Sequence, residues 1–169
     1  MSRPTYIFMD FDGVTHPWGE AEDFRCLPRI EAVVREFSEA RIVIASDWRM
    51  LFSLSRLITR FAEDVRAQIA GVTPQLLPKT GAELHGLRER EAMVWLAQHE
   101  ASPGDAAWCA IDDAPGNWLS RPRLILTDFK RGFTAEDEGA LRRVLQGFRD
   151  GKRNQVGTVA PSLWSRDSA

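Results

Sequence analysis

The sequence predicts an α/β fold in which about five parallel strands are flanked by helices. Short apolar runs of strand length alternate along the chain with segments whose apolar residues recur at helix spacing. This alternation predicts parallel strands joined by crossover helices. Several apolar runs are also followed at once by acidic or hydroxyl side chains, which is typical of the carboxyl edge of a parallel sheet. The length of 169 residues suits one domain with its own core.

The first predicted strand is the apolar run Tyr6-Ile7-Phe8-Met9, which leads directly into Asp10, Asp12 and Gly13. An apolar run that is ended by glycine is typical of a strand buried on both faces. Side chains alternate along a strand, so Asp10 and Asp12 should point the same way. Two carboxylates held this close repel each other unless a cation or a proton lies between them. The alternative is a strand that ends in an acidic turn without a functional role.

The next elements repeat the order of strand and helix. A loop covers 14–27, and Pro28 opens a helix with apolar residues at helix spacing up to Phe37. The second strand is 41–45, which is followed by Ser46-Asp47-Trp48-Arg49. An amphipathic helix is predicted over 51–61. The remaining predicted elements are a weaker strand over 65–71, a helix over about 86–99, a strand over 106–111 that ends in Asp112-Asp113, a strand over 124–127, and a helix capped by Thr134 that runs to about Phe148.

Residues 1–149 are therefore assigned to one domain, and residues 150–169 to a loosely ordered C-terminal tail with few apolar residues. The segments between the predicted strands leave room for core helices but not for a large cap domain. Trp164 is the one large aromatic residue of the tail and is a candidate for docking back onto the domain.

Composition excludes several classes of protein. The formal net charge is −2 and the sequence pI is about 5.9, so the charge does not indicate nucleic acid, although local basic clusters such as Lys130-Arg131 leave phosphate contacts open. Cys26 and Cys109 lie far apart, which fits a reduced, cytoplasmic protein better than a disulfide scaffold. No segment resembles a signal peptide or reaches membrane-spanning length, so we expect no membrane partner. The oligomeric state is not predicted.

The polar residues at the strand ends form the candidate site. Asp10 and Asp12, then Ser46, then Asp112 and Asp113 follow three different strands, whose carboxyl ends meet at one edge of a parallel sheet. Carboxylate oxygens are the ligands that Mg²⁺ prefers, with room left for a substrate phosphate. A hydroxyl group and a cationic side chain should then hold the phosphate oxygens. The candidate cations lie between the second and fourth of these strands, and are Lys79, Arg88 and Arg90.

These motifs together resemble the haloacid dehalogenase (HAD) superfamily over roughly residues 5–148. The closer resemblance is to a compact bacterial HAD-like family linked with Swiss-army-knife RNA-repair proteins. The resemblance implies a Rossmann-like core. One departure is Ala92 and Met93, where the family more often has Ile, and it concerns packing. The matching pieces are Asp10-Phe11-Asp12-Gly13-Val14, Ser46-Asp47-Trp48-Arg49, Gly71-Val72-Thr73-Pro74, Arg88 with Glu91, Trp95-Leu96, and Asp112-Asp113.

The resemblance also implies roles for individual residues. Asp10 is the expected nucleophile, which forms an aspartyl-phosphate. Asp12 is expected to protonate the leaving oxygen and then to activate water. Ser46 is expected to donate a hydrogen bond to the phosphoryl group, and Arg88, with Lys79 and Arg90 as rivals, to neutralise its charge.

The same resemblance implies the metal ligands. Asp112, with Asp113, is expected to bind Mg²⁺ together with Asp10 and the backbone carbonyl of Asp12. The implied function is a Mg²⁺-dependent hydrolase of phosphomonoesters whose substrate is not specified, with nucleic-acid ends and nucleotides left open. The alternatives are a catalytically idle binding or regulatory module and a phosphotransferase that uses an acceptor other than water.

Structural interpretations stand beside these functional ones. Ser46 can cap the following helix, and Arg88 can belong to an exposed, ion-paired helix face. Trp48 is expected in the core, and Arg49 is expected to form a structural pair with Asp47. His16 is expected to be a solvated loop residue.

Overall fold

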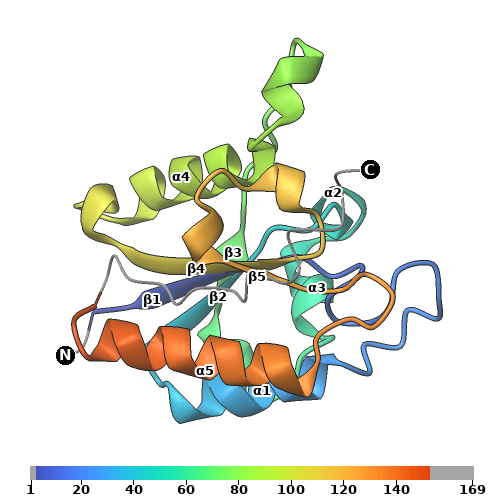
Figure 1. Cartoon of the computed structure of the whole chain (residues 1–169), viewed down its shortest axis with the longest axis vertical. Helices are drawn as coiled ribbons and strands as arrows, with labels where there is room; N and C mark the ends of the chain where they lie inside the picture. Colours follow the sequence, from blue (N-terminus) through green and yellow to red (C-terminus); the bar gives the residue numbers. More distant parts are fainter. Residues whose placement is uncertain (1–2, 153–169) are drawn as a thin grey trace, which may run out of the picture.

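The computed structural model describes residues 3–152, and it confirms the predicted α/β fold (Figure 1). Within these residues, five parallel strands form one sheet in the order β3-β2-β1-β4-β5. The predicted tail lies outside the described residues from position 153 onward, and so does Trp164. In chain order the strands are β1 (Thr5–Met9), β2 (Ala40–Ile44), β3 (Ile69–Val72), β4 (Ala107–Asp112) and β5 (Leu124–Leu126).

Strand β1 is the centre of the sheet, and all five of its residues are buried. It pairs with β2 on one side and with β4 on the other, so that Met9 lies opposite both Ile44 and Ile111. The chain first builds outward from β1 to β3 and then returns to add β4 and β5 on the other side. The point where the order reverses lies between β1 and β4, and in open α/β sheets ligands bind at the carboxyl ends of the strands there.

Helices cover both faces of the sheet (Figure 1). Helices α1 (Leu27–Glu36) and α5 (Ala135–Arg149) lie on one face, and α4 (Leu87–His99) lies on the other. Each face has its own apolar core, and side chains of β1 alternate between the two. Ile7 and Met9 enter the first core, and Tyr6 and Phe8 enter the second.

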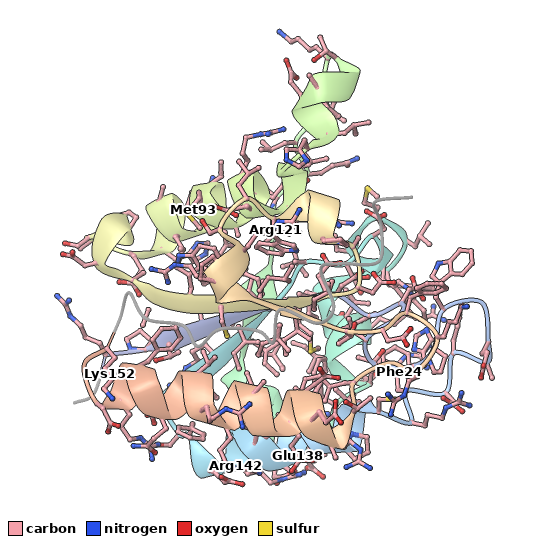
Figure 2. All side chains as sticks on the ribbon, viewed as in Figure 1. Phe24, Met93, Arg121, Glu138, Arg142 and Lys152 are labelled. Atoms are coloured by element: carbon pink, nitrogen blue, oxygen red, sulfur yellow. The ribbon has the colours of Figure 1, made fainter. Side chains whose placement is uncertain are left out.

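The last helix begins as the sequence predicts. Thr134 and Asp137 form a capping box, in which the Thr134 hydroxyl oxygen accepts from the Asp137 amide and the Asp137 carboxylate accepts from the Thr134 amide. On the solvent side of α1 and α5, Arg142 forms ion pairs with Glu36 at 2.8 Å and with Glu138 at 3.1 Å (Figure 2). The contact with Glu36 joins α5 to α1, whereas Glu138 lies on α5 itself.

The prediction of one continuous helix over 51–61 is wrong. The segment forms two short helices, α2 (Trp48–Leu51) and α3 (Leu54–Ile58), because Phe52 is extended between them. Ser53 causes the restart, since its side-chain oxygen accepts from the amide of Arg56 and caps α3. Apolar spacing alone does not detect such a break.

The strand predicted over 65–71 is displaced. Residues 66–68 form a 3₁₀ turn, and β3 starts only at Ile69. The side-chain amide of Gln68 donates to the carbonyls of Val34, Phe37 and Ala40. These hydrogen bonds hold the segment against the end of α1 and delay the strand.

The described residues contain no large cap domain, as predicted. Residues 73–86 protrude from the molecule, and we call this segment the arm; it carries a 3₁₀ turn at Gly81–Leu84 (Figure 1). Among residues 3–152, no cap domain therefore covers the carboxyl edge of the sheet. No helix among residues 3–152 has the length and apolar character needed to span a membrane.

Candidate active site

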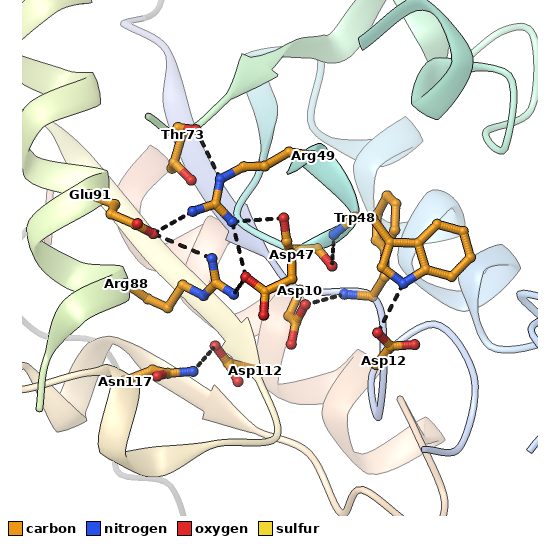
Figure 3. A network of polar contacts seen from close by, with 12 residues as sticks. Asp10, Asp12, Asp47, Trp48, Arg49, Thr73, Arg88, Glu91, Asp112 and Asn117 are labelled. Atoms are coloured by element: carbon orange, nitrogen blue, oxygen red, sulfur yellow. Dashed lines mark hydrogen bonds and ion pairs between the residues drawn. The ribbon is translucent and has the colours of Figure 1, made fainter. Parts of the chain in front are cut away.

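The predicted acidic residues come together at the carboxyl edge of the sheet. Asp10 directly follows β1, and Asp112 is the last residue of β4. The Asp10 amide donates to the Ile111 carbonyl at 3.0 Å, which fixes the end of β1 beside the end of β4. Ser46 follows β2 on the other side of β1 and is fully buried. Figure 3 shows Asp10 and Asp112 facing each other.

Asp10, Asp112 and Asp113 form a cluster that suits a divalent cation. Each offers one carboxylate oxygen, and these oxygens lie within 4.8 Å of one another. Burial, together with repulsion from Asp112, raises the pKa of Asp10 well above its ordinary value. Burial also raises the pKa of Asp112, and burial with the charge of Asp112 raises the pKa of Asp113 to about 7. The negative charge is costly here, and an all-oxygen donor set is the kind that Mg²⁺ binds.

Asp112 is held by donors that the sequence analysis did not identify. The Trp118 indole N–H donates to Oδ2 at 2.8 Å, and the Asn117 amide donates to the same oxygen at 3.3 Å. The Ala114 amide donates to Oδ1 at 2.8 Å. Such donors fix the direction of a metal-ligating carboxylate. The only sequence signal for them was the Pro115-Gly116 turn directly after the acidic pair.

Asp10 is held from two directions. The Phe11 amide donates to its Oδ1 at 2.8 Å, and the Ser46 side chain hydrogen-bonds to the carboxylate and lowers its pKa in opposition to burial. The Ser46 oxygen also accepts a long hydrogen bond of 3.4 Å from the Trp48 amide, in the first turn of α2. Asp47, and not Ser46, is the N-cap of α2, so Ser46 touches the first turn of that helix without capping it, and its contact with a phosphoryl group stays a prediction.

Gly13 permits the close approach of two loops. Its φ is +71°, and a Cβ placed on it would lie 2.1 Å from Oδ2 of Asp113. Its carbonyl accepts from the hydroxyl of Thr127, just after β5, at 2.8 Å. Only glycine adopts this backbone conformation without strain and also leaves free the space that the Asp113 carboxylate occupies.

Asp12 lies at the edge of the cluster, with 38% of its side chain exposed. Its Oδ1 is 3.0 Å from Nε2 of His16, and its Oδ2 accepts from the Trp48 indole N–H at 2.9 Å. The prediction that His16 is a solvated loop residue is wrong, because the chain turns back after Gly13 and leaves His16 only 1% exposed. Trp48 is buried as predicted, but its N–H is used on Asp12.

Arg88 is the cation beside the cluster, and it is buried (Figure 3). Its Nη2 lies 2.6 Å from Oδ1 of Asp47, and its Nη1 lies 3.3 Å from Oε2 of Glu91. Burial disfavours the Arg88 charge, but Asp47, Asp10 and Glu91 outweigh it and raise the pKa of Arg88. The charge of Arg88 in turn lowers the pKa of Asp10 and of Asp112. The alternative of an exposed ion-paired face is wrong for this residue.

The two rival cations lie elsewhere. Lys79 is exposed on the arm, where its amide donates to Glu83 at 2.7 Å. Arg90 donates to the carbonyls of His85 and Glu83 and so faces the arm as well. Of the three candidates, Arg88 is the one whose charge acts on Asp10.

Arg49 forms a buried support beneath Arg88. Its guanidinium donates to Glu91 at 2.7 Å, to the Thr73 carbonyl at 3.0 Å and to the Ser46 carbonyl at 2.7 Å. Arg49 is 3.8 Å from Asp47, so the predicted structural pair is present, but Glu91 is the nearer partner. The network joins the ends of β2 and β3 to α4.

A cavity of about 330 Å³ opens beside Arg88, between α2, α4 and the arm. Arg88 and Asn117, which act on the carboxylates of the cluster, both line this cavity. Its polar lining includes Asp47, Arg88 and Asn117, and its apolar lining includes Met50, Leu77 and Leu84.

One comparison with known proteins found a family whose matched range contains this site. The chain matches the family described as the HAD domain in Swiss Army Knife RNA repair proteins over residues 6–137, a range that contains the acidic cluster, Asp12, Ser46 and Arg88. Searches of the curated proteins and of the solved structures gave no match.

The raised pKa of Asp10 predicts a pH-dependent cost in stability. The pKa of Asp10 is higher in the folded chain than in the unfolded chain, so the folded chain binds more protons. The free energy of unfolding of the wild type should therefore fall as pH rises from about 4 toward the folded-state pKa. Without metal, Asp10→Asn should therefore raise the free energy of unfolding, by about 2 kcal/mol more at pH 8 than at pH 5. Urea unfolding at the two pH values measures it.

Asp64→Asn is the matched control, because Arg35 lowers the pKa of that exposed carboxylate and its removal should not stabilise the fold. Added Mg²⁺ should stabilise the wild type more than Asp10→Asn. A metal-free wild type that is as stable as Asp10→Asn at pH 8 would contradict the charge argument.

Gly13→Ala should weaken Mg²⁺ binding at least tenfold, because the new Cβ must displace the Asp113 carboxylate. Gly19→Ala is the matched control, since its φ of +75° is similar and a Cβ there meets nothing within 4 Å. It should cost about 1 kcal/mol of stability through backbone strain alone and keep the metal affinity. Calorimetric titration with Mg²⁺ measures both variants, and equal losses of affinity would refute the role of the close approach.

Proposed function

The chain belongs to the family of HAD domains in Swiss Army Knife RNA repair proteins, and from that premise we propose that it is a Mg²⁺-dependent phosphomonoester hydrolase acting through an aspartyl-phosphate. Membership supports a phosphatase-type hydrolase in general. The observation that carries the specific proposal is the placing of Asp10 between two different environments. Asp112 and Arg88 lie on one side of it and Asp12 lies on the other (Figure 3).

In the first step, a carboxylate oxygen of Asp10 attacks phosphorus while the bond from phosphorus to the ester oxygen breaks. Asp12 gives its proton to that departing oxygen, so the product leaves as an alcohol. In the second step, Asp12 takes a proton from a water molecule, whose oxygen attacks the aspartyl-phosphate and releases phosphate and Asp10. Asp12 ends the cycle protonated, as it began.

Two groups would hold the phosphoryl oxygens during both steps. Arg88 supplies a fixed positive charge that Asp47 and Glu91 keep in place. Ser46 supplies a buried hydroxyl directly beside Asp10.

The carboxylates of Asp10, Asp112 and Asp113, with the backbone carbonyl of Asp12, would hold Mg²⁺. Their oxygen donors and their unfavourable negative charge fit a divalent cation. The ion would offset the repulsion between Asp10 and an anionic substrate.

For the substrate class, we propose a phosphate at the end of an RNA strand. The family description supports RNA repair as the setting. The open carboxyl edge supports a large substrate, because within residues 3–152 no cap domain covers it. The cavity beside Arg88 offers room for the nucleotide that carries the phosphate.

Hydrolysis of p-nitrophenyl phosphate tests the reaction. The wild type should turn over with Mg²⁺ and stop with EDTA, and Asp10→Asn should lower kcat at least a thousandfold because it removes the nucleophile. Asp64→Asn, which removes an exposed carboxylate that pairs with Arg35, should keep full activity. Activity that survives Asp10→Asn would refute the aspartyl-phosphate. A wild type that binds no Mg²⁺ and hydrolyses no phosphomonoester would favour the binding module.

The substrate class is tested by comparing kcat/KM among phosphate esters. The kcat/KM for RNA oligonucleotides that carry a 5′ or a 3′ phosphate should be at least tenfold higher than for mononucleotides and sugar phosphates. The reason is that a carboxyl edge without a cap domain admits the RNA strand. Equal or higher values for sugar phosphates would contradict the proposed substrate. Transfer of labelled phosphate to an added alcohol instead of water would identify a phosphotransferase.

A further inference from the structure

We propose that His16 and Trp48 form a fixed clamp that holds the Asp12 carboxyl group in the position from which it gives and takes protons. Each of the two residues contacts a different oxygen of Asp12, at 3.0 Å for His16 Nε2 and 2.9 Å for Trp48 Nε1. The inference rests on the proposed function, because it assigns a purpose to these contacts within that reaction. In this reading both are positioning residues, which act through Asp12.

The two contacts fix the carboxyl group because they come from different elements. Trp48 is the first residue of α2, after β2, whereas His16 lies four residues beyond Asp12 in the loop after β1. A partly exposed aspartate at the end of a strand otherwise moves among several rotamers. With both oxygens engaged, rotation about either side-chain bond breaks at least one contact.

His16 is itself held in place. The Thr15 hydroxyl donates to the Phe11 carbonyl at 2.9 Å, so its oxygen accepts from Nδ1 of His16, which is 3.0 Å away. Nε2 is therefore the ring atom that remains for Asp12. The ring packs against Phe24 at 5.1 Å between centroids and against Trp48 at 6.1 Å.

Trp48 is equally constrained. Its ring packs edge-on against Phe11 at 5.8 Å and against Phe24 at 5.4 Å, and it belongs to the core under α1 and α5. The clamp is thus part of the apolar core. Its rigidity comes from packing, so it needs no lid that closes over the substrate.

A purely structural interpretation also exists, in which Asp12 merely satisfies two buried polar groups. The exposed fractions of the three side chains favour the clamp. His16 is 1% exposed and Trp48 is 6% exposed, whereas 38% of the Asp12 side chain meets solvent. The two aromatic groups are buried, and the carboxyl group that they hold is the one that meets solvent.

The leaving group of the substrate separates the two interpretations. The p-nitrophenolate of p-nitrophenyl phosphate leaves readily without a proton, whereas the oxygen of an alkyl phosphate such as glycerol 2-phosphate must be protonated as it leaves. Loss of the position of Asp12 should therefore affect the alkyl ester far more. The ratio kcat/KM is the quantity to compare, because it reports only the steps up to the departure of the leaving group.

Trp48→Phe keeps an aromatic ring in the core and removes the N–H that contacts Asp12. His16→Phe likewise keeps an aromatic ring and removes the Nε2 atom that contacts Asp12. Each should lower kcat/KM about tenfold more for glycerol 2-phosphate than for p-nitrophenyl phosphate. His16→Gln, whose side-chain amide can accept through its oxygen or donate through its nitrogen in place of Nε2, should recover most of the loss. Trp18→Phe is the matched control, because Trp18 is 64% exposed and should leave both values unchanged.

If Trp48→Phe and His16→Phe lower kcat/KM equally for both esters, or lower it for neither, the clamp is overturned. Activity of the wild type on the same esters still supports the hydrolase. A wild type that is inactive on both esters and on RNA oligonucleotides with terminal phosphates, with or without Mg²⁺, overturns the hydrolase and the clamp together. If His16→Phe does not fold, Trp48→Phe and His16→Gln decide the question by the same ratio.

Discussion

Repulsion among three carboxylates is the constraint around which the site is built. Asp10 and Asp112 cannot move apart, because β1 and β4 are neighbours in a parallel register that places Met9 opposite Ile111. Burial between the two apolar cores then raises the pKa of both groups. The fold keeps a charge arrangement that is unfavourable without a cation, and its two cores offset the cost.

The surrounding donors distribute this charge unevenly. On the side of α4, Arg88 presents positive charge to the cluster, and the buried pair of Arg49 with Glu91 lies beside Arg88. On the opposite side, Asp12 is held by the aromatic side chains of His16 and Trp48 and remains partly exposed. An anionic group that enters from solvent therefore meets the Arg88 cation on one side and the Asp12 carboxyl group on the other. This division follows from which strand ends lie beside which helix.

How much of the molecule is predictable from sequence depends on the range of the interaction. The strands and the acidic residues after them were found because apolar runs and strand ends are local patterns. The break at Ser53 and the late start of β3 were missed, since a single cap and the hydrogen bonds of Gln68 to a distant helix decided them. The choice of Arg88 over Lys79 was left open for the same reason, because it depends on which way the arm carries its side chains.

The sequence alone determined the α/β class, the parallel sheet and the acidic groups at its carboxyl edge, because each depends on residues adjacent in the chain. The tertiary structure alone decided that His16 is buried and that the N–H of Trp48 is directed at Asp12. Residues 12 and 48 meet only because β1 and β2 are paired and α2 begins directly after β2. Contacts between segments far apart in the chain leave no periodic trace in the sequence, so the geometry of the site comes from the packing.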